Sequence, residues 1–365
     1  MLRFHTLLHL LTAGLVALAV SFPILAEDTA SPPIRPADCC PAEKCRSNDS
    51  FWLISTRHLG STNGCGNFDL KFSRVGACEA QTCASRGEFL ADESFGRTLF
   101  YVHGNRISPS NAIQRARTLH KEISCKICDD RPIRLVVWSW PSERVRGPVN
   151  DIRAKGERTN SESFYLGQLL QEMPADKPID FVGYSFGSRI VTGALHLANG
   201  GGIRKVALPN AAQIARGRIV LMAPAIHSDW LLSGRKHERA LDSNDGILVL
   251  YNSCDPALKH YRFIEKCSKP AALGFVGLAN CGTVSPAYAQ KNVSHVVGKS
   301  HDEYKYLCSP CIIGLIADQL CRKASSSAPE IAIPEIAAPE IAIPEIAAEP
   351  AIETASTDST ANKSS

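Results

Sequence analysis

Apolar runs of four or five residues recur along the middle of the chain, and each ends in a polar residue, a glycine or a proline. The runs are rich in β-branched and aromatic residues, which is typical of strands buried on both faces of a parallel sheet. Between several of them, apolar positions recur at the spacing of an amphipathic helix. The predicted strands are residues 99–102, 133–137, 179–182, 219–222, 247–250 and 293–297. The predicted helices are residues 111–123, 163–173 and 189–198.

Strands that alternate with helices indicate βαβ crossovers and a parallel sheet covered on both faces. The pattern therefore predicts an α/β fold with a mainly parallel, doubly wound sheet, formed by one domain over residues 51–323. In such sheets the carboxyl ends of the strands meet at one edge, and ligands bind there. Residues that directly follow the predicted strands are therefore the first candidates for chemistry.

Ser185 follows one of these strands, in the pentapeptide Gly183-Tyr184-Ser185-Phe186-Gly187. A G-x-S-x-G pattern between a strand and a helix presents its serine as a nucleophile on a sharp turn. Gly183 and Gly187 have no Cβ to obstruct that turn or the close approach of helix and strand. The alternative is an ordinary Gly/Ser turn after a strand.

A nucleophilic serine needs a base, and the base needs a group that orients it. Asp255 and Asp229 each follow a predicted strand, so either could supply the orienting carboxylate. His301 lies in the loop after the last predicted strand, whereas His295 lies inside that strand. The order Ser185, Asp255, His301 is the chain order of the triad in folds with a nucleophile turn of this kind.

An acyl-transfer site also needs two hydrogen-bond donors for the oxyanion that forms during the reaction. The backbone N–H of Phe186, directly after the serine, is one candidate. The second is expected in the loop after the strand at residues 99–102, where His103, Gly104 and Asn105 follow one another. We expect the N–H of Asn105 to complete the oxyanion hole.

The chain resembles the α/β-hydrolase superfamily, in a bacterial esterase/lipase-like branch of largely uncharacterised proteins. The resemblance covers residues 51–323 and rests on four segments, at residues 100–105, 138–142, 183–187 and 251–258. It implies Ser185 as nucleophile, Asp255 and His301 as its partners, no cofactor, and a small-molecule or lipid ester as substrate. In that branch histidine and methionine often flank the serine, and the tyrosine and phenylalanine found here bear on substrate preference.

The N-terminus predicts export. Residues 1–26 combine a weakly basic start, an apolar core and a small-residue cleavage site at Ala26, which is typical of a signal peptide. The alternative is an uncleaved anchor. We expect a secreted, periplasmic or cell-envelope protein with no transmembrane span in the mature chain, in which a Cys/Pro-rich lead segment, residues 27–50, precedes the hydrolase-like domain.

Cysteine usage agrees with an oxidising compartment. All 14 cysteines lie beyond the predicted cleavage site. Two C-x-x-C pairs, Cys125/Cys128 and Cys308/Cys311, allow a zinc site as the alternative, but they lie far apart and lack the compact spacing of a zinc ribbon. The expectation is disulfide bonds and no metal.

The C-terminal segment, residues 324–365, has a different composition. Residues 328–337 and 338–347 have the same sequence, Ala-Pro-Glu-Ile-Ala-Ile-Pro-Glu-Ile-Ala. A proline at every fifth position prevents a continuous helix, so we expect a disordered, extended tail that either has no function or contacts the cell envelope. The formal net charge of +4, from 40 basic and 36 acidic residues, provides no basic face for nucleic acid.

These features together favour a secreted serine hydrolase that cleaves carboxylic esters through an acyl-enzyme on Ser185. One alternative is a non-catalytic envelope or surface binding module with a hydrolase-like body. Another is an amidase or peptidase that uses the same triad, because a fold does not determine its chemistry.

Overall fold

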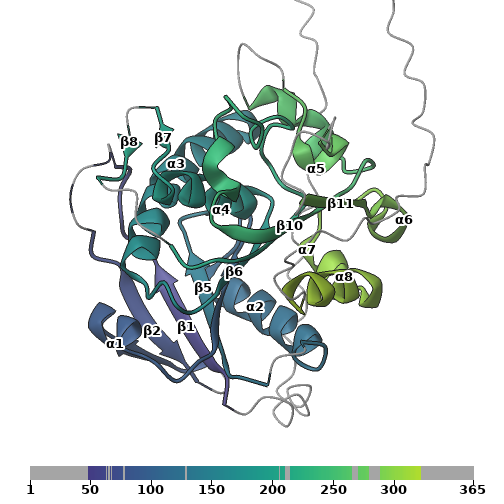
Figure 1. The fold of residues 1–365 in the computed structure, drawn as a ribbon. Coiled ribbons are helices and arrows are strands. Elements are labelled where there is room, and N and C mark those ends of the chain that lie inside the picture. Colours follow the sequence, from purple (N-terminus) through teal and green to yellow (C-terminus); the bar gives the residue numbers. More distant parts are fainter. Residues whose placement is uncertain are drawn as a thin grey trace, which may run out of the picture. The chain divides into compact units, whose positions relative to one another are not determined.

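The structure, a computed structural model, describes most of the chain between residues 48 and 321 (Figure 1). The described residues are 48–62, 64, 66, 68–76, 79–127, 130–204, 206–209, 214–264, 270–278 and 288–321. They belong to one compact unit, Met1–Ala328, and a second unit, Pro329–Ser365, lies outside them. The predicted signal peptide, the lead segment up to residue 47 and the repeat tail therefore lie outside the described residues.

A twisted sheet of nine strands runs through the described residues, in the order β11-β10-β9-β6-β4-β5-β1-β2-β3 (Figure 1). Its neighbouring strands are parallel, except that β2 is antiparallel to both β1 and β3 at one edge. The mainly parallel sheet predicted from the apolar runs is confirmed. The strands are β1 (Ser50–Ser55), β2 (Lys71–Val75), β3 (Gln81–Ala84), β4 (Arg97–Val102), β5 (Ile133–Ser139), β6 (Ile179–Tyr184), β9 (Gly217–Met222), β10 (Asn244–Tyr251) and β11 (Tyr288–Asn292).

The chain reverses its direction of travel across the sheet in the middle of the strand order. After β4 it forms β5 on one side, next to β1, and then crosses to form β6 on the other side of β4. The connections that leave β4 and β6 therefore diverge. In doubly wound sheets a crevice at the carboxyl ends of the strands opens at such a reversal.

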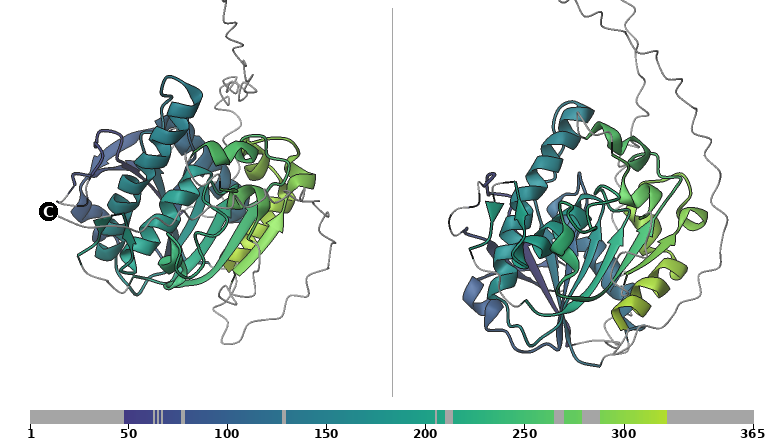
Figure 2. Two further views of the ribbon diagram at one scale, coloured as in Figure 1. Left: turned by 90° about the horizontal axis from the view of Figure 1, so that it is seen from above. Right: turned by 45° about the horizontal axis from the view of Figure 1, so that its top comes forward.

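Helices cover both faces of the sheet (Figures 1 and 2). On one face α3 (Pro148–Glu172) and α4 (Phe186–Ala198) pack on each other, and α4 packs on β4 and β6. On the other face α2 (Pro109–Ser124) packs on β5 and on α8 (Pro310–Cys321), which itself packs on β9 and β10. The predicted doubly wound arrangement is confirmed.

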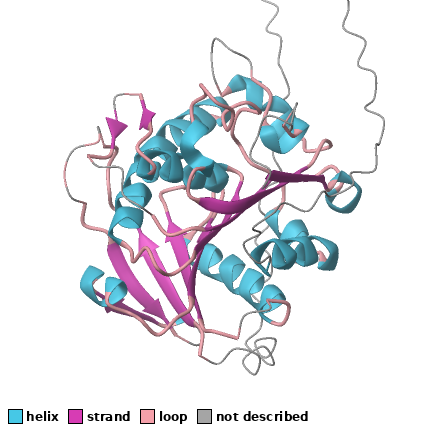
Figure 3. Cartoon of the chain, in the orientation of Figure 1, coloured by secondary structure: helices cyan, strands magenta, loops and turns pink. Residues whose placement is uncertain are grey.

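Short elements lie in the connections (Figure 3). They are α1 (Arg86–Leu90), the hairpin of β7 (Gly202–Ile203) and β8 (Val206–Ala207), η4 (Glu238–Leu241), η5 (Leu258–Phe263), α5 (Leu273–Val276), α6 (Ser294–Val297) and α7 (Glu303–Leu307). η5 and α5 follow β10, and α6 and α7 follow β11, so these four belong to connections that leave the carboxyl edge of the sheet.

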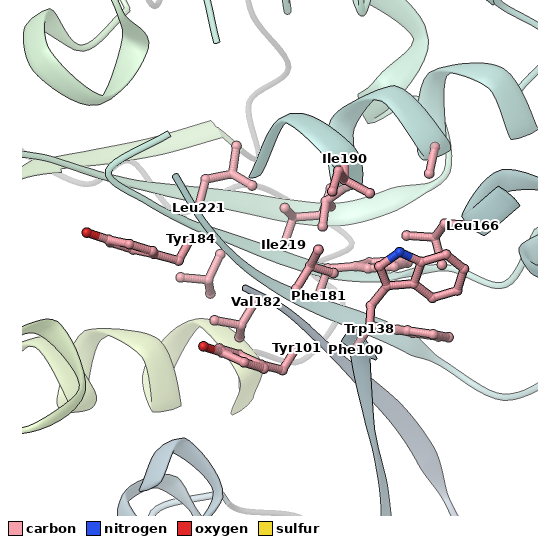
Figure 4. Close-up of a cluster of buried hydrophobic side chains, with 14 of the residues drawn as sticks. Phe100, Tyr101, Trp138, Leu166, Phe181, Val182, Tyr184, Ile190, Ile219 and Leu221 are labelled. Atoms are coloured by element: carbon pink, nitrogen blue, oxygen red, sulfur yellow. The ribbon is translucent and has the colours of Figure 1, made fainter. Parts of the chain in front are cut away.

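Alternation along the central strands divides the core between the two faces (Figure 4). Parallel register pairs Phe100 of β4 with Phe181 of β6, and their rings stack at 5.5 Å between centroids, on the side that faces α3 and α4. Tyr101 and Val182, the next pair, point to the opposite face. All four are buried. Because both faces are covered, these strands are apolar throughout, which is why the sequence pattern identified them.

The helix predicted at residues 163–173 begins much earlier, since α3 starts at Pro148. The part of α3 before residue 163 buries polar side chains that conceal the apolar periodicity. Glu162 is fully buried, accepts hydrogen bonds from Thr56 Oγ1 (2.7 Å) and Trp138 Nε1 (3.1 Å), and pairs with Arg158 (2.6 Å). Burial raises the pKa of this carboxyl group, and the three partners offset part of that cost.

The strand predicted at residues 293–297 is wrong. Residues Ser294–Val297 form the short helix α6, and the last strand is the preceding segment, Tyr288–Asn292. That strand lies at the sheet edge and is only half-buried, so its sequence, YAQKN, lacks the apolar run that marks the central strands. The segment that follows is still a connection at the carboxyl edge.

Candidate active site

Ser185 stands at the junction of β6 and α4, in a backbone conformation that non-glycine residues rarely adopt. Its φ is 51° and its ψ is −115°. The turn is held on both sides: the Ser185 N–H donates to the carbonyl of Met222 (3.0 Å), and its carbonyl accepts from the N–H of Ala225 (3.1 Å). Backbone strain of this kind persists only where the surroundings hold it, and it is frequent at functional sites.

Three glycines make this turn sterically possible. A Cβ on Gly187 would overlap the carbonyl of Val102 in β4, and one on Gly183 would lie 2.9 Å from the Cα of Ser188. A Cβ on Gly104, in the loop after β4, would lie 2.8 Å from the ring of Tyr184. The elbow and the loop after β4 can therefore approach one another only as glycine backbone.

The structure brings Ser185, His301 and Asp255 together. Nε2 of His301 lies 3.0 Å from Oγ of Ser185, and Nδ1 lies 2.6 Å from Oδ2 of Asp255. Asp255 is fully buried, and its other oxygen accepts from the backbone N–H groups of Ala257 and Leu258, each at 2.9 Å. The carboxylate therefore has a defined orientation toward the imidazole, which in turn faces the hydroxyl.

The competing acid, Asp229, does not join this chain of contacts. Its carboxylate pairs with Arg235 at 3.4 Å, and 40% of its side chain is exposed. His295 lies in α6, and within the described residues no hydrogen bond joins it to Ser185. Both side chains follow strands in the sequence, but only Asp255 and His301 lie where their functional atoms meet.

The loop after β4 lies beside the elbow. The N–H groups of Arg106 and Ile107 are occupied, since they donate to the carbonyl (2.8 Å) and the hydroxyl (3.1 Å) of Ser142. The side chain of Asn105 donates to Asp151 of α3 (3.2 Å), which fixes this residue. Phe186 is the first residue of α4, where an N–H has no acceptor within the helix. None of these contacts involves the backbone N–H groups of Asn105 and Phe186, the two donors expected for the oxyanion hole.

The chain has only remote similarity to known proteins. No protein-family model matches the chain, and no curated protein is significantly similar to it in sequence. Among solved structures, carboxyl esterase 2 from the mycorrhizal fungus Tuber melanosporum is 14% identical over 69% of this chain and 82% of its own, with a TM-score of 0.31. Esterase B from Lactobacillus rhamnosis is 12% identical over 74% of this chain and 84% of its own, with a TM-score of 0.36. Lipase B from Aspergillus fumigatus is 11% identical over 73% of this chain and 63% of its own, with a TM-score of 0.36.

These scores are too low to carry an argument about substrate. The decisive features are internal to the chain: a mainly parallel, doubly wound sheet, a strained serine between β6 and α4, and an acid and a histidine on the connections after β10 and β11. The fold is that of an α/β hydrolase. The fold class inferred from the sequence is confirmed, and the resemblance to the α/β-hydrolase superfamily is confirmed as far as the fold.

In this α/β-hydrolase fold, Asn252 connects the loop of the acid to the loop of the base, a role that the sequence did not reveal. Its side-chain amide donates to the carbonyls of Gly298 (2.9 Å) and Ser300 (3.1 Å), directly before His301. Its Oδ1 accepts from the N–H of Cys254 (3.0 Å), directly before the acid. Asn252 is fully buried. Its place at a strand end, three residues before the acid, is the only signal that the sequence carries.

Replacing Asn252 by aspartate is expected to lower kcat for ester hydrolysis by about 10- to 100-fold with little change in KM, because small errors in alignment cost that much. The carboxylate cannot donate and would face two carbonyl oxygens. Steady-state kinetics on a p-nitrophenyl ester measure the effect. Asn292→Ala is the control, since Asn292 contacts Ser253 on the same edge (3.1 Å). An unchanged kcat with a lower Tm would show that Asn252 only stabilises the fold.

Glu303 anchors the other side of the histidine loop. It is fully buried two residues after His301, and it accepts from the hydroxyl of Tyr101 (2.6 Å) and from Nη1 of Arg115 (2.8 Å). Burial raises the pKa of Glu303, and the guanidinium of Arg115 opposes that shift. Tyr101 belongs to β4 and Arg115 to α2, so the start of α7 is tied to the sheet itself.

His103, which precedes the loop of Asn105, is a structural histidine. It is fully buried, and its Nδ1 lies 2.9 Å from the carbonyl of Gly104. Nε2 accepts from the backbone N–H of Trp140 (3.3 Å) and lies 3.4 Å from the guanidinium of Arg57. A proton on Nε2 would face two donors. Burial, assisted by Arg57, lowers the pKa of His103 from 6.5 to about 3.

This shift predicts acid sensitivity of the fold. The folded-state pKa of His103 lies below its unfolded value, so stability is lost as the pH falls below about 6.5, where only the unfolded chain binds the proton. Between pH 7.5 and pH 5 the loss is about 2 kcal/mol. Urea unfolding at pH 7.5 and pH 5 measures the free energy of unfolding. Its decrease between the two pH values should be smaller by about 2 kcal/mol in His103→Asn than in the unmodified protein. Equal losses in the two proteins would contradict the assignment.

Cysteines and metal ligands do not form a site in the described residues. Cys83, Cys254, Cys308 and Cys311 carry free thiols, so the disulfides expected from the sequence are not seen at these positions. Cys128, the partner in the other C-x-x-C pair, lies outside the described residues. Within the described ranges, no three His, Cys, Asp or Glu side chains are grouped as a metal site would require.

Within the described residues, no helix is both long and apolar enough to cross a membrane.

Proposed function

We propose that the protein is a serine hydrolase that cleaves carboxylic esters through an acyl-enzyme on Ser185. The observation that carries the proposal is the continuous series of contacts from Ser185 Oγ to His301 Nε2 (3.0 Å), and from His301 Nδ1 to Asp255 Oδ2 (2.6 Å). Serine, histidine and a buried carboxylate in this geometry activate a hydroxyl that is otherwise a poor nucleophile. The amidase and the non-catalytic alternatives have no specific observation in their favour.

In the first half of the reaction, Ser185 Oγ attacks the ester carbonyl while its proton moves to His301 Nε2. The resulting imidazolium donates through Nδ1 to Asp255, whose second oxygen stays occupied by two backbone N–H groups. The carbonyl oxygen becomes an oxyanion and accepts from the N–H groups of Phe186 and Asn105. The tetrahedral intermediate collapses, Nε2–H protonates the leaving alkoxide, and the acyl group remains on Ser185 as an ester.

In the second half, water takes the place of the alcohol. His301 Nε2 removes a proton from the water as its oxygen attacks the acyl-enzyme, and the same oxyanion hole holds the second intermediate. Collapse returns the proton to Ser185 Oγ and releases the acid. The geometry of the site is therefore used twice, with His301 acting first as base and then as acid in each half.

The residues next to the serine shape the site. The ring of Tyr184 is buried and lies 5.3 Å from the ring of His301 and 5.9 Å from that of Tyr306. Phe186 is buried as well. Aromatic walls of this kind exclude water from the histidine and strengthen the electrostatic interactions within the site. These are the two positions at which the chain departs from the pattern of the branch that it resembles.

Export is proposed on the sequence alone. The predicted signal peptide, the lead segment and the repeat tail, for which envelope contact is the proposed role, all lie outside the described residues. Eight of the 14 cysteines also lie outside them, so disulfide formation after export stays part of the proposal for those positions. Sequencing the N-terminus of the protein recovered from the cell envelope or the medium tests cleavage after Ala26.

The experiment that tests the catalytic proposal uses a fluorophosphonate probe, which forms a stable adduct with activated serines. We expect one adduct per chain, at Ser185, together with hydrolysis of p-nitrophenyl butyrate. A folded protein that neither reacts with the probe nor hydrolyses the ester would favour the non-catalytic module. Turnover of p-nitrophenyl amides in excess of the matching esters would favour the amidase.

A further inference from the structure

Arg189 is a buried cation beside the proposed active site. It lies on α4, four residues after Ser185, and only 4% of it is exposed. Nη1 donates to the hydroxyl of Tyr261 (3.3 Å), and the guanidinium lies 4.5 Å from the ring centroid of Trp230. Within the described residues Nε has no hydrogen-bond partner, and no carboxylate pairs with the guanidinium. Burying a guanidinium without an acid is costly, and the contact with Trp230 offsets only part of that cost.

Acidic side chains of α3 pair with other arginines. Asp151 pairs with Arg106 (2.9 Å), Glu157 with Arg204 (2.6 Å) and Glu162 with Arg158 (2.6 Å). Within the described residues, none of these three carboxylates pairs with Arg189.

The contacts of Arg189 place its charge at the edge of the sheet that carries the site. Trp230 follows β9 and Tyr261 follows β10, so both belong to connections at the carboxyl ends of the strands. A Cβ on Gly156 of α3 would lie 4.0 Å from the guanidinium carbon. Gly156 comes five residues after Asp151, which holds Asn105, so the two positions are about 7.5 Å apart along the helix axis.

A second cation lies at the same indole. Nζ of Lys236 lies 4.2 Å from the ring centroid of Trp230. Arg189 and Lys236 therefore place two positive charges at Trp230, where an anion would be stabilised.

We propose that Arg189 binds a carboxylate of the ester substrate, so that the enzyme prefers esters that carry a negative charge over neutral esters of the same size. The inference rests on the proposed function and names its substrate class. A guanidinium matches a carboxylate with two parallel hydrogen bonds, which a neutral group of the same shape does not form. Trp230 keeps the guanidinium plane in place.

The test compares kcat/KM for charged and neutral esters of matched length. The acyl series pairs the mono-4-nitrophenyl esters of succinate, glutarate and adipate with 4-nitrophenyl butyrate, pentanoate and hexanoate. The alcohol-side pair is 4-acetoxybenzoate and 4-acetoxybenzamide. We expect the unmodified protein to prefer the anion at least about tenfold in one pair, since charged hydrogen bonds discriminate on this scale. In Arg189→Gln the anionic ester should lose at least about tenfold more than its neutral partner.

Controls separate charge recognition from folding. Arg235→Gln, which removes an exposed cation of the Trp230 connection, should keep the preference, and Arg189→Lys should keep part of it. If Arg189→Gln does not fold, competition in the unmodified protein decides: glutarate should inhibit hydrolysis of the neutral ester at concentrations at which glutaramide does not. A preference that is absent in the unmodified protein, or that survives in Arg189→Gln, would overturn the inference. Hydrolysis of no ester at all, without probe labelling, would instead overturn the proposed function.

Discussion

Ser185→Ala is expected to lower kcat for p-nitrophenyl butyrate by at least about 10³-fold, since removal of the nucleophile leaves only binding and oxyanion stabilisation. The strained turn should persist in the variant, because Met222 and Ala225 hold it through the backbone of residue 185 and not through its side chain. KM and Tm are therefore expected to change little. Stopped spectrophotometric assays over a range of enzyme concentrations can measure so large a loss.

The matched control is Ser253→Ala. Ser253 is an exposed serine on the connection after β10, and within the described residues its hydroxyl accepts one hydrogen bond, from Nδ2 of Asn292 (3.1 Å). This variant should retain full turnover and react with a fluorophosphonate at the rate of the unmodified protein. Activity in Ser185→Ala equal to that of the unmodified protein would place the chemistry at another residue.

His301→Ala is expected to be nearly as damaging as Ser185→Ala, and the double variant should be no worse than either single one. The two residues act as one unit, so their losses do not add. Asp255→Asn should also reduce kcat strongly, because an amide at this position favours the wrong tautomer of the imidazole and no longer stabilises its charged form. Kinetics of the two single variants and the double variant on one ester measure this.

Asp229→Asn is the control for the acid. Its carboxylate pairs with Arg235 and its side chain is 40% exposed, so turnover should remain within about twofold of the unmodified value, as for most surface changes. Loss of turnover in Asp229→Asn together with normal turnover in Asp255→Asn would reassign the acid. Additive losses in Ser185→Ala and His301→Ala would show that the two side chains do not work together.

The central strands could be identified from the sequence because they are covered on both faces. Each of β4, β5, β6, β9 and β10 is a nearly continuous apolar run, a pattern that needs no knowledge of its neighbours. Edge strands lack this signal. β11 is half-buried and polar, which is why the neighbouring apolar residues 293–297 were mistaken for a strand.

Buried polar side chains concealed part of a helix from the hydrophobic pattern. The part of α3 before residue 163 carries Asp151, Thr159 and Glu162 on buried positions, where hydrogen bonds and ion pairs satisfy them. No hydrophobic periodicity can reveal such a helix, because its buried face is held by hydrogen bonds and ion pairs. The start of α3 at Pro148 was therefore established only by the tertiary structure, in which the sheet and the loop of Asn105 supply partners for these polar side chains.

The elbow was determined locally. A strand, two glycines, a serine and a helix-forming segment lie within about ten consecutive residues, and steric exclusion at Gly183 and Gly187 leaves little choice of backbone. The positions of the partners of Ser185, in contrast, were not determined by neighbouring residues. Asp255 and His301 lie 46 residues apart, and His301 lies 116 residues from the serine, so their meeting depends on the strand order and on the loops that Asn252 and Glu303 hold.

The sequence alone therefore determined which serine stands on a sharp turn, which strands are buried, and which acids and histidines follow strands. Only the tertiary structure decided between Asp255 and Asp229, because both satisfy the same local rule and differ only in which distant group each meets: His301 for one and Arg235 for the other. It alone showed that, within the described residues, Arg189 contacts Tyr261 and Trp230 and no carboxylate pairs with it. The conformation of a turn depends on neighbouring residues, whereas the pairing of charges depends on which segments the folded sheet brings side by side.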